Sequence, residues 1–302
     1  MRKSLISKLI CPAALGLTMF PAWSQTTVPV YASPQVALET LVDAMAKNDA
    51  EAALNAIDPR ARDLVKADDP AAIATMMQDL LALYRAGYRF VPQDDRVTIV
   101  LGEDAWPFPV SLRKGPDGWT FDTETARTEI RNREIGAAEL GAIDILLTYV
   151  DIQTQYRKTD HDGDGVLEFA ASLISSEGAR DGLYWPGGDS PVGDVAARAS
   201  LDGFSQNGID TAAEPLGGYF YRVLVAQGPS APGGAMSYLV NGNMLAGHAA
   251  LAVPAQYGVS GINSFLVSEA GTVYQADLGP DTLEVAFDIG AFDPGPGWEA
   301  VE

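Results

Sequence analysis

The stretch Asp160-His161-Asp162-Gly163-Asp164-Gly165-Val166-Leu167-Glu168 separates a helix-rich first half of the chain from a glycine-rich second half. Three aspartates at a spacing of two can direct three carboxylates at one centre, while Gly165 takes a sharp turn. Calcium prefers several oxygen ligands supplied by one short loop. We therefore expect a Ca²⁺ site whose ligands are Asp160, Asp162, Asp164, the Val166 carbonyl and Glu168.

This loop is incomplete when it is numbered as an EF-hand. The three aspartates take positions 1, 3 and 5, Val166 takes position 7 and Glu168 takes position 9, but position 12, normally a bidentate glutamate, is Ala171. The alternative is a solvated turn that caps the preceding helix. Three neighbouring carboxylates repel one another without a cation, which favours a calcium loop with a structural role.

The sequence around the loop predicts a second α+β domain over residues 135–292. A long helix should precede the loop, with an apolar stripe of Ile135, Leu140, Ile143, Leu146, Leu147, Val150 and Tyr156. Short helical pieces are expected at 169–174 and 195–204. Alternating strands are expected at 219–225, 236–240, 245–253, 262–267 and 272–274, with Asn241-Gly242 as a hairpin turn. The long helix should pack against a four- or five-stranded antiparallel sheet, and 293–302 should be a tail.

The part of the chain before this domain predicts a smaller α+β domain over residues 33–123. Ser33-Pro34 and Asp69-Pro70 are helix starts, and a third helix is expected at 50–57. From Val97 the apolar period changes to two, which predicts a meander of three antiparallel strands at 97–101, 108–112 and 119–121. A charged connector at 124–134 should join the two domains, each with helices packed on antiparallel strands.

The N-terminus is typical of a secretory signal peptide over residues 1–24. Three basic residues precede an apolar run, and Ala22-Trp23-Ser24 forms a small-x-small cleavage site. The mature chain should begin with an exposed tether at 25–32 and be periplasmic or secreted. No other stretch approaches the ~20 apolar residues of a membrane helix, so we expect no membrane insertion after cleavage.

The charge balance excludes nucleic acid as a partner. The chain carries a net charge of −20, and loss of the three basic residues of the signal makes it −23. A protein that binds nucleic acid needs a basic stripe, which is missing here. The single cysteine, Cys11, leaves with the signal, so the mature chain has neither a disulfide nor a thiol nucleophile.

Histidine-dependent catalysis has little support in the sequence. His161 and His248 are the only histidines, His248 falls in a predicted strand, and no Gly-x-Ser-x-Gly elbow is present. We expect His161 to be a bystander to the metal. Forty acidic residues always permit some carboxylate pair, so that pattern does not identify a hydrolase. We therefore favour a protein that is not an enzyme.

A second candidate site lies shortly after the aspartate loop. Arg180, Asp181, Tyr184 and Trp185 offer a cation, a carboxylate and an aromatic wall, which are the materials of a small-ligand pocket. The alternative is an ion pair that fixes a loop and a tryptophan that fills the interface between the two domains, and we favour this alternative.

Six long blocks of sequence resemble a family of secreted bacterial proteins known as the domain of unknown function 2950 family. The blocks are WPFPVSL (106–112), GWTFDTETARTEIRNREIGAAEL (118–140), DHDGDGVLEFA (160–170), ARDGLYWP (179–186), YFYRVLVAQGPSAPGGAMSYLVNG (219–242) and ALAVPAQYGVSGINSFLVSEAGTVYQADLGPDT (250–282). The resemblance covers nearly the whole mature chain. It implies an exported bacterial protein and transfers no activity or substrate.

The second half also resembles the globular heads of pilin-like proteins, with a helix, a polar loop and then strands. It departs from them because charged residues, among them Arg127, Arg131 and Glu134, precede the helix where a pilin carries an apolar membrane-spanning segment.

These observations together predict an interaction or assembly module with an unknown envelope protein as its partner. The alternative is a hydrolase or small-ligand-binding protein with its site near Arg180 to Trp185.

Overall fold

The computed structural model describes residues 27–65, 69–206 and 209–301 and shows an α+β protein, as the sequence predicts. The chain divides into two compact units, Met1–Ala126 and Arg127–Glu302. The predicted signal peptide, 1–24, lies outside the described residues. Within these residues no helix is both long enough and apolar enough to cross a membrane.

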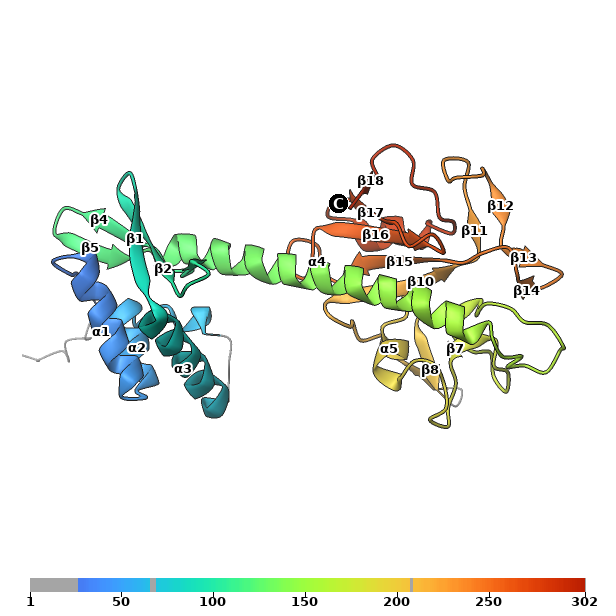
Figure 1. Cartoon of the computed structure of the whole chain (residues 1–302), viewed down its shortest axis with the longest axis horizontal. Helices are drawn as coiled ribbons and strands as arrows, with labels where there is room; N and C mark the ends of the chain where they lie inside the picture. The colour runs from blue at the N-terminus through green and yellow to red at the C-terminus, as the bar shows by residue number, and fades with distance from the viewer. Residues whose placement is uncertain (1–26, 66–68, 207–208, 302) are drawn as a thin grey trace, which may run out of the picture. The chain divides into compact units, whose positions relative to one another are not determined.

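The first unit packs three helices against an antiparallel sheet (Figure 1). The helices are α1 (Pro34–Ala46), α2 (Ala50–Ile57) and α3 (Pro70–Ala86), with a 3-10 turn at Arg62–Leu64. The strands are β1 (Tyr88–Gln93), β2 (Arg96–Leu101), β3 (Trp106–Pro107), β4 (Leu112–Gly115) and β5 (Gly118–Phe121), in the order β1-β2-β4-β5 with β3 also paired to β2.

The helix starts of this unit follow directly from the local sequence. The Ser33 hydroxyl accepts the Val36 N–H at 3.3 Å, and the Asp69 carboxylate accepts the Ala71 N–H at 3.0 Å, so both helices begin where a cap precedes proline. The core forms between these helices and the sheet, around the fully buried Leu112 and Ile99.

The strands of the first unit differ from the prediction in two places. Strand β1 was not expected, and it exists because it pairs residue by residue with β2 from Tyr88 to Gln93. The strand expected at 108–112 is reduced to Leu112 at the start of β4, since Pro107 and Pro109 lack the N–H groups that a ladder needs. Tyr31, in the expected tether, is buried and pairs with Trp119.

Helix α4 (Thr123–Tyr156) begins earlier than predicted and includes the expected connector. The Asp122 carboxylate accepts the Thr125 N–H at 3.1 Å and caps the first turn. Within the charged stretch, Arg133 Nε donates to Glu129 at 2.7 Å, an i,i+4 pair that supports helix. The charged stretch that was predicted as a connector is therefore the first part of a helix.

The second unit is built on the sheet β10-β15-β16-β17-β18, which is antiparallel throughout. Its strands are β10 (Tyr219–Leu224), β15 (Ala249–Pro254), β16 (Asn263–Ser268), β17 (Val273–Asp277) and β18 (Glu299–Ala300). The smaller elements are β6 (Ser172–Ile174), β7 (Gly182–Tyr184), α5 (Asp194–Arg198), β8 (Phe204–Gln206), β9 (Ile209–Thr211), β11 (Ala226–Gln227), β12 (Met236–Ser237), β13 (Leu239–Val240), β14 (Asn243–Met244) and α6 (Thr282–Phe287).

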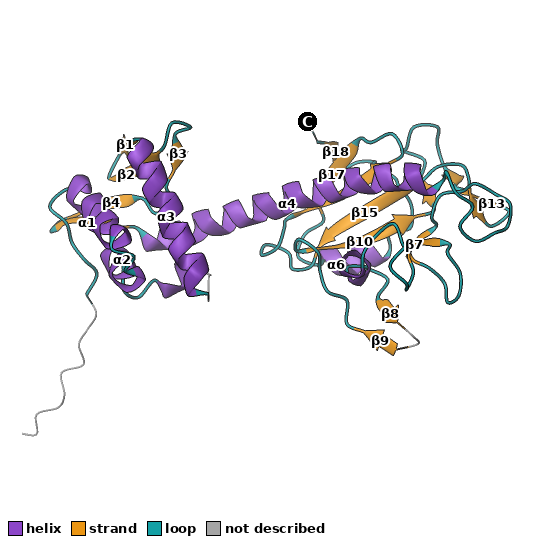
Figure 2. Ribbon diagram, turned by 60° about the horizontal axis from the view of Figure 1, so that its bottom comes forward, coloured by secondary structure: helices purple, strands orange, loops and turns teal. Residues whose placement is uncertain are grey.

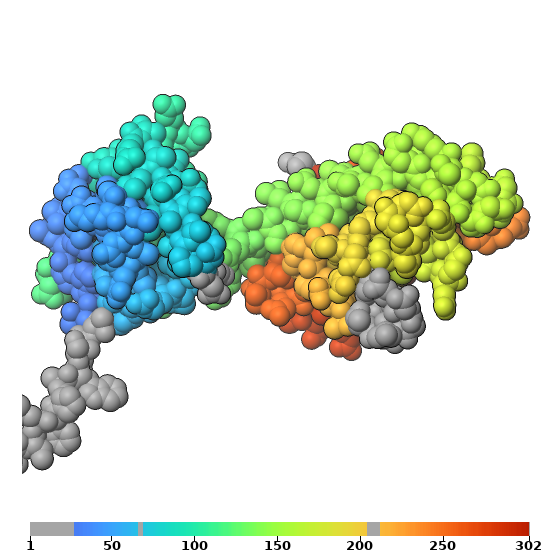
Figure 3. Space-filling model, turned by 90° about the horizontal axis from the view of Figure 1, so that it is seen from below, coloured from blue at the N-terminus to red at the C-terminus, as the bar shows by residue number. Residues whose placement is uncertain are grey.

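Both faces of this sheet are covered. Helix α4 runs along one face, where Ala250 and Ala252 of β15 pack with Leu146, while Leu251 and Val253 face a second cluster that contains α6 (Figure 2). This explains why all six residues of β15 are buried. On the α4 side, the segment around α5 lies next to the helix, as the space-filling view shows in yellow and green (Figure 3).

The buried seam of α4 differs in part from the expected stripe. Leu140 is 66% exposed and Leu147 is 40% exposed, so neither contributes to the core. Ile135 of the expected stripe is buried, and further along the helix the seam consists of Ala142, Leu146, Tyr149, Gln153 and Tyr156. A spacing of alternately four and three residues keeps these five on one side of the helix.

Three further expectations for the second unit are corrected. Residues 172–174 of the expected helical piece at 169–174 form β6, which pairs in parallel with β7. The helical piece expected at 195–204 ends at Arg198 as α5, after which the chain bridges Ser200 to Tyr221 of β10. The expected tail at 293–302 supplies β18, which adds to the edge of the sheet beside β17.

Candidate metal centre

The aspartate loop begins where α4 ends. The N–H of Arg157 still bonds to the Gln153 carbonyl at 3.1 Å and that of Thr159 to the Tyr156 carbonyl at 3.2 Å, so the last helical turn delivers Asp160 to the loop. Gly163 and Gly165 have φ values of 81° and 86°. Both are in the left-handed region that glycine tolerates best, and the predicted sharp turn at Gly165 is present.

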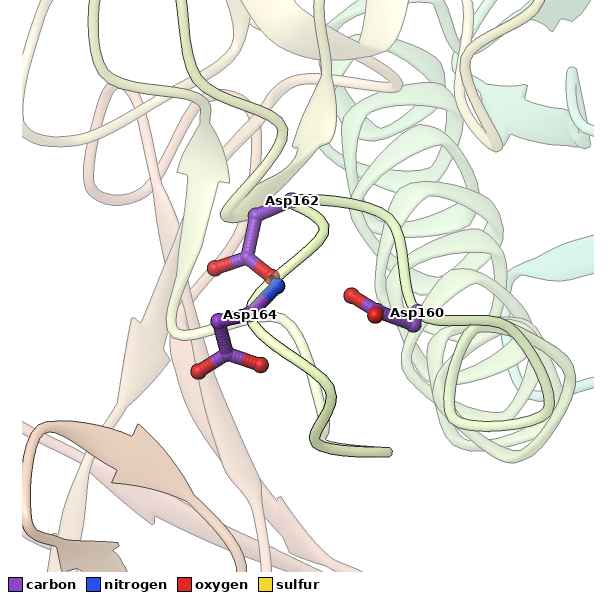
Figure 4. Close-up of side chains that lie close together, drawn as sticks. All are labelled: Asp160, Asp162 and Asp164. Carbon is purple, nitrogen blue, oxygen red and sulfur yellow. Dashed lines mark hydrogen bonds between the residues drawn. The ribbon is translucent and has the colours of Figure 1, made fainter.

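Asp160, Asp162 and Asp164 each offer a carboxylate oxygen, and these three oxygens lie within 4.8 Å of one another. Asp160 accepts the N–H groups of Gly163 at 2.7 Å and Gly165 at 2.9 Å. These bonds hold the pKa of Asp160 below its usual value. Figure 4 shows the Asp160 carboxylate directed at the loop that carries the other two. The backbone therefore orients three carboxylates around a small volume.

The loop is attached to the hairpin of β13 and β14. Asn243 Nδ2 donates to Asp164 at 2.5 Å, the Met244 N–H donates to Glu168 at 2.8 Å, and the Phe169 N–H donates to the Met244 carbonyl at 2.9 Å. Residues nearly 80 positions apart in the sequence are thus held together next to the aspartates.

Glu168 is the expected ligand with the least favourable charge environment. Partial burial raises its pKa, and the charges of Asp162 and Asp164 raise it further, although the Met244 N–H opposes this. A bound dication would offset this repulsion and keep Glu168 ionised. The Val166 N–H donates to Asp164 at 2.7 Å. That the Val166 carbonyl binds the metal ion stays a prediction.

His161 has a packing role that the sequence did not indicate. Its ring stacks on Tyr156 at a centroid distance of 4.3 Å and lies 5.4 Å from the ring of Trp185. The Tyr156 hydroxyl in turn donates to the Arg180 carbonyl. His161 therefore anchors the aspartate loop to the end of α4 and to the segment that follows β7.

The four residues of the second candidate site are bonded within their own segment. Trp185 is only 4% exposed and donates its indole N–H to Asp189 at 2.7 Å. Arg180 pairs with the same aspartate at 3.1 Å, and its guanidinium lies 5.0 Å from the Trp185 ring.

The other two members point to separate partners. Both carboxylate oxygens of Asp181 accept from Ser176, at 2.8 Å each. The Tyr184 ring is buried, and its hydroxyl contacts Asp194 at 3.2 Å. The structure therefore brings Arg180 and Trp185 together, whereas Asp181 and Tyr184 bind separate partners, and the role of the four as a ligand pocket stays a prediction.

A family model described as a protein of unknown function (DUF2950) matches residues 29–301. The chain belongs to the DUF2950 family. The resemblance seen in the sequence is therefore confirmed over nearly the whole described chain. No curated protein and no solved structure matches this DUF2950 chain, and its likeness to pilin-like heads stays a prediction.

One buried polar cluster of this DUF2950 protein was missed in the sequence. Gln153 donates to the Tyr149 hydroxyl at 3.1 Å and to the Ala170 carbonyl at 2.9 Å, and it accepts the Ala170 N–H at 2.9 Å. The fully buried His248 lies against the Tyr149 ring at 5.3 Å. In the sequence, the only sign of this cluster was Gln153, a polar residue at a core position of α4. The rest of the cluster was not predictable because it comes from distant segments.

Proposed function

We propose that this DUF2950 protein is an exported, non-enzymatic interaction or assembly module of the bacterial envelope, with a structural calcium loop in its second unit. The observation that carries the proposal is the convergence of three carboxylate oxygens within 4.8 Å on backbone turns that fix their directions. Hard oxygen donors from one short loop are the ligand set that calcium prefers.

A structural role for the ion is supported by the attachments of the loop. Residues 160–168 contact α4 through His161 and strand β14 through Asp164 and Glu168. An ion that binds the aspartates would therefore connect the end of the long helix to a hairpin from a distant part of the chain. Loss of the ion should loosen this connection and leave the two sheets intact.

The positions of the histidines support a non-enzymatic reading. The ring of His248 is fully buried, so it cannot reach a substrate in solvent. The ring of His161 is stacked on an aromatic side chain. The alternative, a hydrolase or small-ligand-binding protein with its site near Arg180 to Trp185, has less support because those side chains already bind one another or neighbours in the same segment.

Calcium removal tests the metal proposal. With a dissociation constant near 10⁻⁴ M, roughly that of extracellular calcium modules, 10 mM calcium should raise the free energy of unfolding by about 2.7 kcal/mol relative to EDTA. For a unit of this size the melting temperature should rise by about 5–10 °C. Differential scanning calorimetry of the mature chain in calcium and in EDTA gives this shift directly.

Two variants make the calcium experiment specific. Asp162→Asn removes one ligand charge and should abolish most of the calcium-dependent shift. Asp144→Asn makes the same change at an exposed aspartate of α4 and should leave the shift intact. Equal melting temperatures of the wild-type protein in calcium and EDTA would refute the site.

Export is checked separately, by sequencing the N-terminus of protein from the envelope fraction, which should start at Gln25.

A further inference from the structure

The second unit contains a cavity of about 210 Å³ between α4, the sheet and the segment around α5. Its walls include Ile145 and Ile152 of α4, Leu173 of β6, Leu183 of β7, Ala196 of α5 and Ala250 of β15. Ligand-binding pockets are concave and lined mostly by apolar side chains, and this cavity has both properties.

The hydroxyl groups that line the cavity are all engaged with the protein backbone. Thr148, Tyr149 and Tyr221 donate to main-chain carbonyls at 2.8, 2.9 and 3.2 Å, respectively. Because these hydroxyl protons are already used, a ligand carboxylate or carbonyl inside the cavity would lose its hydrogen bonds to water without a replacement, which carries a desolvation cost. The lining therefore selects for an apolar ligand.

The charged residue of the lining, Arg222, is also committed elsewhere. Its guanidinium pairs with Asp202 at 2.7 Å and donates to the carbonyl of Ala286, at the end of α6, at 3.0 Å. It therefore has no role as a counter-ion for a ligand head group inside the cavity.

The cavity meets the surface along one side of α4. Thr148 in its lining is exposed, and Ile145 and Ile152 are partly exposed on either side of it. A ligand can therefore enter between the helix and the α5 segment without unfolding of the sheet.

We propose that this cavity binds a saturated hydrocarbon chain, with a volume of about seven methylene groups if each occupies roughly as much space as a liquid water molecule. The apolar walls favour the chain through burial of its surface. Any polar end of the ligand must remain at the Thr148 side, in solvent. This inference is independent of the calcium loop, whose residues do not line the cavity.

Binding of 1-octanol to the intact mature protein tests the proposal, with 1,8-octanediol as the polar match. Titration calorimetry and methyl NMR should show saturable octanol binding with shifts of the Ile145 and Leu183 methyls. The diol should bind at least tenfold more weakly, because one hydroxyl must enter the apolar cavity. Absence of saturable octanol binding, or equal affinity for the diol, would overturn the proposal.

Substitutions on α5 locate the site. Ala196→Phe places a ring in the cavity and should weaken octanol binding at least tenfold, whereas Val195→Phe, on the exposed side of the same helix, should leave it unchanged. If Ala196→Phe does not fold, Thr148→Phe at the exposed rim provides the same test by covering the entrance. Wild-type affinity in a folded cavity variant would place the ligand elsewhere and exclude this cavity as its site.

Discussion

His248 should make the second unit sensitive to mild acid. The side chain is fully buried, with its ring 5.3 Å from that of Tyr149 and 4.6 Å from that of Phe169. Within the described part of the chain, neither of its ring nitrogens has a hydrogen-bond partner. Burial and, as the smaller cause, the positive charge of Arg157 together lower the pKa of His248 to about 4. The folded protein therefore favours the neutral ring.

The sign of the effect follows from this shift. A histidine with a lowered pKa in the folded state contributes its full stability above its unfolded pKa of about 6.5, and this contribution is lost as the pH falls toward 4. At pH 5 the loss relative to pH 8 is about 2 kcal/mol, and it approaches about 3 kcal/mol below pH 4. The raised pKa of Glu168 has the opposite effect on stability near pH 5. The folded protein favours the protonated carboxyl, so the contribution of Glu168 to stability increases as the pH falls.

Native-state hydrogen exchange of the β15 amides at pH 8 and pH 5 measures the stability of the second unit specifically. His248→Phe, which has an aromatic ring that cannot be charged, should lose about 2 kcal/mol less than the wild-type protein over this range. His161→Phe is the matched control, because it removes the other histidine and should retain the wild-type loss. If His248→Phe loses as much stability as the wild-type protein, protonation of the buried ring is not the cause and the reasoning fails.

Two further pairs of variants test the packing. Leu146→Ala, at a fully buried position of α4, should lower the free energy of unfolding by about 2–5 kcal/mol in urea titrations, while Leu140→Ala at an exposed position should change it by less than about 0.5 kcal/mol. Gly118→Ala should destabilise the first unit more than Gly87→Ala in thermal unfolding. Both glycines have a φ near 147°, but a Cβ on Gly118 would lie 2.6 Å from the Tyr31 carbonyl oxygen, whereas a Cβ on Gly87 would meet open space. Equal losses within either pair would contradict the packing described above.

Local features of the fold were predictable because the groups that stabilise them are close in sequence. The caps at Ser33 and Asp69, the left-handed turn at Gly165 and the grouping of Asp160, Asp162 and Asp164 depend on hydrogen bonds that span five residues or fewer. The α+β class also followed from the change in apolar period. The family followed from long blocks of sequence, and it is confirmed.

Errors arose where one pattern is compatible with two environments. The charges at 124–134 suit an exposed connector as well as an exposed helix, and only the cap at Asp122 and the continuation into a packed helix distinguish them. Leu140 and Leu147 fit a helical stripe, yet the sheet contacts the adjacent side of α4 through Leu146 and Tyr149. Which side of a helix is buried depends on its partner, and the partner is distant in the sequence.

By itself the sequence therefore determined the starts of α1, α2 and α3, the aspartate turn, the acidic character and the family of this protein. The tertiary structure alone decided that His161 anchors the loop, that β18 completes the sheet and that His248 is buried with no hydrogen-bond partner among the described residues. It also decided that residues from α4, β7, α5 and β15 line one apolar cavity. The physical reason is range: hydrogen bonds within a turn are fixed by neighbours in the chain, whereas burial depends on segments that meet only after the whole unit has folded.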